Sequence, residues 1–89
     1  MKHLFETIAA SAVKREGVVY SLAAPAGHRD VIRHMVAQGA PIPAGGIQGF
    51  LTSMGRFVLR REAKTLALQS AQLLPSARPR AELHSEDVW

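Results

Sequence analysis

The chain has 89 residues, of which 47% are hydrophobic, and its formal net charge is +4. This length predicts one small domain with a thin core, and the apolar fraction excludes an intrinsically disordered chain. The lack of cysteine excludes disulfides and thiolate metal sites, and it favours a reducing compartment. No apolar run is long enough to span a membrane and no signal-peptide pattern opens the chain, so we expect a cytoplasmic protein without membrane contact.

The first stretch, residues 4–16, is predicted to form a helix, because its apolar residues recur near a period of 3.6. Gly17 follows at the position where a C-cap glycine is expected. We therefore divide the chain into a variable N-terminal helix, residues 1–17, and a single α+β domain, residues 18–89.

The middle of the chain alternates between strand and helix patterns. Residues 18–22, VVYSL, predict a short strand, and their nearly continuous apolar run indicates that both faces of this strand are covered. After a Pro/Gly break, residues 28–38 predict a helix with one apolar stripe. A second Pro/Gly connector, residues 40–46, follows.

The densest stretch of glycine, hydroxyl and arginine residues comes next. Gly55 is expected to adopt a positive φ in a hairpin turn, and Pro75 is expected to end the last helix. The stretch predicts in order a strand, a turn, a returning strand and a helix, at residues 47–51, 52–55, 56–58 and 59–74.

The tail, residues 75–89, shows no periodicity. Because a free terminal Trp89 would expose a large apolar surface, we expect it to dock on the body or on another subunit, with Glu86 and Asp87 pairing with arginines. The predicted fold class is α+β: a small, mainly antiparallel sheet with helices packed on it, in the order α-β-α-β-β-α. The thin core favours a homo-oligomer.

Several separated motifs resemble a small family of phage and prophage proteins of unknown function. They are GFLTSMGRFV at residues 49–58, Arg60 followed by Glu62-Ala63, and the closing SEDVW. The VYSL and APA segments near residues 19–26 add to the resemblance, which covers residues 18–89 and leaves the predicted N-terminal helix outside.

The chain departs from that family at two places. Leu59 stands where the family often has an acidic residue, and Gly27, His28 and Arg29 stand where it tends to have Arg-His-His. The resemblance implies a phage protein in a bacterial host cell, with an accessory or anti-defence role and no known reaction.

One candidate anion site lies on the predicted hairpin, at Thr52, Ser53, Gly55 and Arg56, together with Arg60 and Arg61 at the start of the next helix. Backbone N–H groups at a turn and at a helix N-terminus bind anions, and arginines bind phosphate with two parallel hydrogen bonds. The alternative is a plain hairpin whose hydroxyls satisfy the turn and whose arginines face water.

A second candidate group lies where the first strand passes into the helix, at Ser21, His28, Arg29 and His34. Tyr20 is expected to orient the ligand together with Thr52 and Ser53. Strand ends followed by a helix N-terminus often hold ligands. The alternative is that His28 caps the helix and His34 lies on the surface. We expect this group and the hairpin group to form one pocket.

These features favour a protein that binds and sequesters a phosphate-bearing, nucleotide-like ligand without catalysis. No histidine pair has the spacing of a helical zinc site, no nucleophile elbow is present, and we expect neither a metal nor a cofactor. The alternatives are an anti-CRISPR-like inhibitor of a host defence protein and a non-specific nucleic-acid-binding protein.

Overall fold

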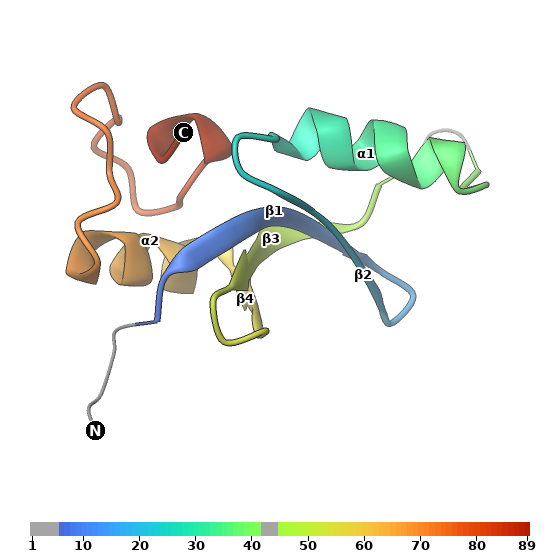
Figure 1. The fold of residues 1–89 in the computed structure, drawn as a ribbon, viewed down its shortest axis with the longest axis horizontal. Coiled ribbons are helices and arrows are strands. Elements are labelled where there is room, and N and C mark those ends of the chain that lie inside the picture. Colours follow the sequence, from blue (N-terminus) through green and yellow to red (C-terminus); the bar gives the residue numbers. More distant parts are fainter. Residues whose placement is uncertain (1–5, 42–44) are drawn as a thin grey trace.

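The computed structural model describes residues 6–41 and 45–89 and confirms an α+β fold, a four-stranded antiparallel sheet with two helices packed on it (Figure 1). The strands lie in the order β2-β1-β3-β4. The elements are β1 (Ile8–Arg15), β2 (Val18–Ala23), α1 (His28–Ala37), β3 (Ile47–Thr52), β4 (Phe57–Leu59), α2 (Arg60–Gln69) and the short 3-10 helix η1 (Ser85–Asp87).

The helix predicted at residues 4–16 is wrong, because residues 8–15 form β1, an interior strand of the sheet. Val13 of β1 pairs with Tyr20 of β2 on one side and with Gln48 of β3 on the other. Hydrogen bonding on both sides and burial outweigh the helix propensity of the alanines in this stretch. The observed order is therefore β-β-α-β-β-α, and β1 belongs to the domain.

Gly17 has the positive φ that glycine favours, but it closes a hairpin and not a helix. Glu16 and Gly17 have φ values of +50° and +80° and connect β1 directly to β2. Two consecutive residues with positive φ are the pattern of a type I′ turn, whose twist matches that of the flanking strands.

The strands and helices predicted after residue 17 are confirmed with shifted ends, and residues 42–44 of the predicted Pro/Gly connector lie outside the described residues. β2 is an edge strand on which Val18 is 51% exposed, so the prediction that both of its faces are covered is wrong. The returning strand begins one residue later than predicted, and α2 ends at Gln69 and not at residue 74. Ala71 has a φ of +57°, which turns the chain out of the helix. The Gln72 side chain then bonds the backbone of Ile8, accepting from its N–H at 2.8 Å and donating to its carbonyl at 2.9 Å. The helix therefore ends where the chain returns to β1, before Pro75.

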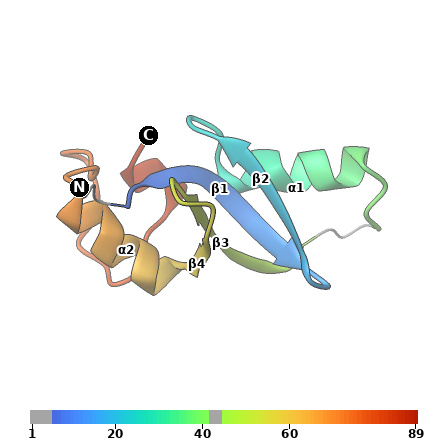
Figure 2. The same cartoon turned by 60° about the horizontal axis from the view of Figure 1, so that its bottom comes forward.

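Both helices cover the same face of the sheet, and they lie at opposite ends of it (Figures 1 and 2). Under α1, the buried cluster comprises Val13, Val31 and Met35. Under α2 and the C-terminal tail, it comprises Ile8, Phe50, Val58, Ala63, Ala67, Leu83 and Val88. Because the last two of these residues come from the tail, the tail is part of the core.

We expect a side chain to be tolerated at Gly45 but not at Gly49. A Cβ on Gly49 would lie 2.3 Å from the carbonyl oxygen of Val58 and 2.8 Å from the Phe57 ring, but a Cβ on Gly45 would meet nothing within 4 Å. Gly49→Ala should lower the free energy of unfolding by about 1–3 kcal/mol, as overpacking does. Gly45→Ala should change it by less than about 0.5 kcal/mol in the same urea titration. Equal effects would contradict the close approach.

Candidate functional site

The predicted hairpin arginine is held by acidic groups within the chain. Arg56 donates two hydrogen bonds to the carboxylate of Glu6, at 2.8 and 2.9 Å, and one to Glu62 at 3.0 Å. Hydrogen bonds from Arg56 and then from the Thr52 hydroxyl lower the pKa of Glu6 from 4.5 to about 2. The hydrogen bond to Glu6 in turn raises the pKa of Arg56. Two carboxylates thus neutralise Arg56, which is a poor starting point for binding a phosphate.

The hydroxyl groups of the hairpin are also used internally. The Ser53 hydroxyl accepts a hydrogen bond from the backbone N–H of Thr7 at 2.9 Å, and the Ser53 N–H donates to the Thr7 carbonyl at 2.8 Å. The Thr52 hydroxyl accepts from the backbone N–H of Arg56 at 3.2 Å. Gly55 has a φ of +81°, which confirms the positive φ predicted for it. The hairpin therefore fastens the segment that leads into β1.

His28 joins the start of α1 to the sheet. Its Nε2 lies 2.7 Å from the carbonyl oxygen of Gly49, to which it donates, and its ring meets the Phe50 ring edge-on at 4.9 Å. The residue is 8% exposed. Burial lowers the pKa of His28, and the charge of Arg60 lowers it further, although the bond to Gly49 acts in the opposite direction. His28 therefore joins α1 to β3 through these two contacts.

Arg60, at the start of α2, is directed at the C-terminal tail. Its guanidinium donates to the carbonyl of Leu83 at 2.7 Å and to the side-chain oxygen of Gln48. The backbone N–H of Leu83 donates back to the Arg60 carbonyl at 3.0 Å. Burial lowers the pKa of Arg60. This arginine therefore fixes the tail against β3.

The end of the tail packs on the body of the protein. The Trp89 indole N–H donates to the carbonyl of Ala26 at 2.9 Å, which confirms that Trp89 docks on the body. Asp87 is 1% exposed and lies 3.2 Å from Arg80. Burial alone would raise the pKa of Asp87, but hydrogen bonds from the His84 N–H and from Arg80 lower it overall.

The structure does not bring the two predicted groups of site residues together. Between the described residues, no hydrogen bond or ion pair joins the turn at 52–56 to the segment at 23–29. The two segments lie on opposite sides of the sheet in Figure 1. Ser21 and Tyr20 are consecutive strand residues and point to opposite faces, and Arg29 lies exposed on α1.

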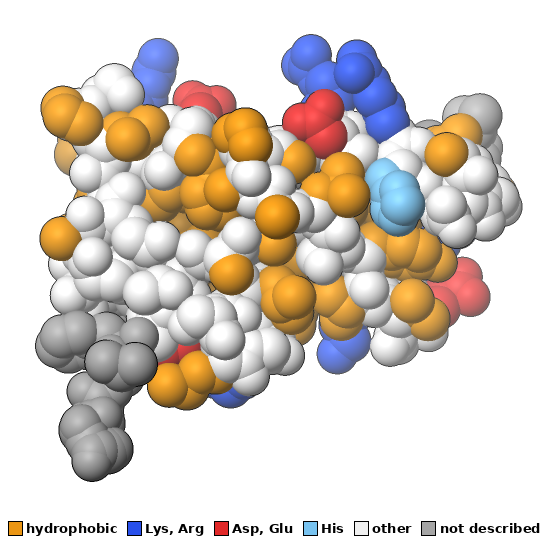
Figure 3. All heavy atoms as spheres, viewed as in Figure 1, with side chains coloured by type: hydrophobic (Ala, Val, Ile, Leu, Met, Phe, Trp, Pro, Cys, Tyr) orange, Lys and Arg blue, Asp and Glu red, His pale blue; other side chains and the backbone are white. Residues whose placement is uncertain are grey.

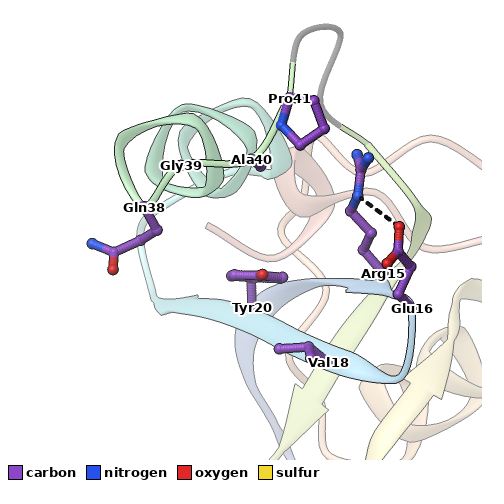
Figure 4. A pocket seen from close by; sticks show the side chains of 8 residues that line it. All are labelled: Arg15, Glu16, Val18, Tyr20, Gln38, Gly39, Ala40 and Pro41. Carbon is purple, nitrogen blue, oxygen red and sulfur yellow. Dashed lines mark ion pairs between the residues drawn. The ribbon is translucent and has the colours of Figure 1, made fainter.

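A cavity of about 450 Å³ lies between the β1–β2 hairpin and the end of α1 (Figure 4). Tyr20 lies at the centre of the group of side chains that form it, with Arg15 to one side. The lining comprises Arg15, Glu16, Val18, Tyr20, Gln38, Gly39, Ala40 and Pro41. Tyr20 is therefore the one residue of the predicted site that lines this cavity.

Arg15 is the cation of this cavity, and its internal contacts are long. Its Nε lies 3.8 Å from the carboxylate of Glu16, which is 85% exposed, and its Nη1 lies 3.4 Å from the carbonyl of Gly45. Such contacts are weak compared with the bidentate pair at Arg56. The sequence predicted no binding role for Arg15, because a helix was expected there, with Arg15 favouring its C-terminal end. Only the hairpin register brings Arg15 and Tyr20 to the same cavity.

Other cations gather on the outer surface of α1 (Figure 3). Arg29 and Arg33 lie one helical turn apart and are exposed. Within residues 6–41 and 45–89, no three His, Asp or Glu side chains converge as a metal site requires. In the same ranges, no helix is both long enough and apolar enough to cross a membrane.

A protein-family model described as "Phage T4 y16D protein" matches residues 7–89. This match confirms the resemblance to a phage protein family and corrects its extent, because it includes β1, which was expected to lie outside. No curated protein and no solved structure matches the chain.

The lowered pKa of His28 predicts a loss of stability in mild acid. Since the unfolded chain takes up a proton more readily than buried His28, the free energy of unfolding should fall as pH drops below about 6.5. His28→Gln keeps an N–H donor for the Gly49 carbonyl but does not titrate, so its loss between about pH 7 and 5 should be smaller. Urea titrations at both pH values measure this, and equal losses in the two proteins would contradict it.

The lowered pKa of Glu6 predicts a second loss of stability, at a more acidic pH. A carboxylate whose pKa is lowered by folding stabilises the protein above its ordinary pKa, and this contribution is lost as pH falls. The melting temperature of Glu6→Gln should therefore lie below that of the unchanged protein above pH 4.5, and the gap should close as pH approaches 2. A gap that is independent of pH would remove the Arg56 pair as its cause.

Proposed function

Because the chain belongs to the phage T4 y16D protein family, we propose that it is a phage accessory protein that binds a phosphate-bearing, nucleotide-like ligand without converting it. By holding such a ligand in the cytoplasm of the host cell, it would withdraw a signal on which a host defence system depends. This role combines the phage context of the family with the chemistry of one cavity.

The cavity beside Tyr20 is the observation that carries the proposal. Its volume of about 450 Å³ suits one nucleotide-sized molecule, since ligand pockets usually measure roughly 300–1,000 Å³. An aromatic ring offers a surface on which a base can stack, which contributes about 1–3 kcal/mol per base. Tyr20 supplies that ring at the centre of the lining.

Arg15 supplies the charge for the phosphate. Its guanidinium is held by one long ion pair and one long hydrogen bond, so a phosphate can replace both contacts with shorter ones. The Arg15 side chain is 25% exposed, and partial burial strengthens an ion pair relative to one in open water. The cavity therefore takes over the role that was first expected of Arg56 and Arg60.

The lining favours binding over turnover. Among the described residues that line it, Glu16 is the one carboxylate, and that side chain is 85% exposed and faces Arg15. His28, the histidine expected in the site, is bonded to Gly49 and is not among the lining residues. A site with an aromatic ring and an arginine but no positioned general base is suited to holding a ligand.

A second candidate function is inhibition of a host defence protein by direct contact. Arg29 and Arg33, exposed on successive turns of α1, favour it, since they offer two guanidinium groups to an acidic partner surface. The same arginines would give non-specific affinity for nucleic acid, which falls steeply with salt.

A melting screen with mono-, di- and cyclic nucleotides tests the ligand proposal. A ligand that binds the folded state adds about 2.7 kcal/mol of stability at a hundredfold excess over its Kd, so the melting temperature should rise with ligand concentration. Arg15→Ala and Tyr20→Leu should each remove the rise, while Arg61→Ala, which changes an exposed arginine of α2 outside the cavity, should keep it.

Mass spectrometry of the nucleotide after incubation should recover it unchanged. A screen in which no nucleotide moves the melting temperature would contradict the proposal, and a product of different mass would contradict its non-catalytic part. A shift that survives Arg15→Ala would exclude this cavity as the site. Binding of mixed-sequence DNA that weakens steeply with salt would favour the nucleic-acid alternative.

A further inference from the structure

The sheet face that lies opposite the helices is almost free of charge. The strand register places eleven side-chain positions on this open face: Ala10, Ala12, Lys14, Val19, Ser21, Ala23, Ile47, Gly49, Leu51, Phe57 and Leu59. Both buried clusters lie on the other face, under α1, α2 and the tail. Lys14 is the one charged residue of the open face.

The open face carries several large apolar side chains that are exposed. Ile47 is 57% exposed, Leu59 is 55% exposed and Val19 is 38% exposed. In the centre, the Phe57 ring lies against Gly49, where even a Cβ would come within 2.8 Å of it. Ala12, which pairs with Gly49, is fully buried among these neighbours.

Such a pattern differs from that of a sheet face in water. An antiparallel sheet with one solvated face alternates apolar residues inward with polar residues outward. Here the outward positions of β3 are Ile47, Gly49 and Leu51, and those of β4 are Phe57 and Leu59. Strands that are apolar on both sides are typical of a sheet that is covered on both faces.

The charge of the open face indicates which kind of partner suits it. A nucleic acid or an acidic protein would be met by cations, but the single cation of the open face, Lys14, holds its ammonium 5.9 Å from the centroid of the Phe57 ring. The arginine pair Arg29 and Arg33 lies on α1, on the other side of the sheet. An apolar face with a single cation is complementary to an identical apolar face, because neither copy brings opposite charge that would have to be paired.

We propose that a second copy of this chain covers the open face and forms a symmetric dimer through it. The two sheets would stack face to face about 10 Å apart, as in a β-sandwich, with the same residues contributed by each copy. The added burial supplements the thin core of an 89-residue chain. Tyr20 and its cavity lie on the helix side, so this dimer does not depend on the ligand proposal.

Native mass spectrometry and light scattering over a dilution series test the dimer. The unchanged protein should be dimeric at micromolar concentration, and Leu59→Glu and Ile47→Glu should each raise the dimer dissociation constant by at least about tenfold, because each buries a charge in the interface. Leu68→Glu is the matched control, since Leu68 is 59% exposed but lies on α2. The Leu68→Glu variant should stay dimeric.

Three results would overturn the proposal: a monomeric unchanged protein at every concentration, open-face variants that dimerise normally, or a Leu68→Glu variant that is weakened as much as Leu59→Glu. Circular dichroism reports whether each variant is folded. If glutamate unfolds the chain, Leu59→Ser and Ile47→Ser compared with Leu68→Ser decide the same question.

Discussion

The packing around Phe50 holds the separate parts of this small domain together. Phe50 is fully buried in β3, and two aromatic rings meet it edge-on, His28 at 4.9 Å and Trp89 at 6.3 Å. His28 opens α1 and Trp89 closes the chain, and each also donates a hydrogen bond to a backbone carbonyl, of Gly49 and Ala26 respectively. Aromatic pairs add about 0.5–1.5 kcal/mol each beyond the area they bury, which is a large share for a domain of this size.

Because the separate parts are held together in this way, several residues that the sequence singled out make their contacts within the chain. Arg60 fixes the tail, Trp89 completes the aromatic group, and Arg56 pairs with Glu6 in the segment that leads into β1. A polar residue that is needed to satisfy a buried partner is costly to replace, whether or not a ligand touches it. Several residues of these motifs are thus used inside the chain, while the cavity at Arg15 and Tyr20 lies away from most of them.

Local patterns predicted the elements between residues 18 and 69 well, because β-branched runs, turn glycines and apolar stripes are short-range signals. They failed at β1, where alanines on the open side hide the alternation of a strand, and the helix propensity of alanine dominated. They also failed at contacts between distant residues: Glu6 pairs with Arg56 across 50 positions, and Gln72 reaches Ile8 across 64. The cavity was missed for the same reason, since Arg15 and Tyr20 line one cavity only once β1 and β2 pair.

The two sides of the sheet present different surfaces, and only one of them carries the cavity. The helix side carries the cavity and the exposed arginines of α1, whereas the open side carries apolar residues and one lysine. In a dimer formed through the open faces, the two cavities would lie on the outer sides, which carry the helices. Each copy would then bind its ligand independently, with two ligands per dimer, because cooperativity requires a change that both sites share.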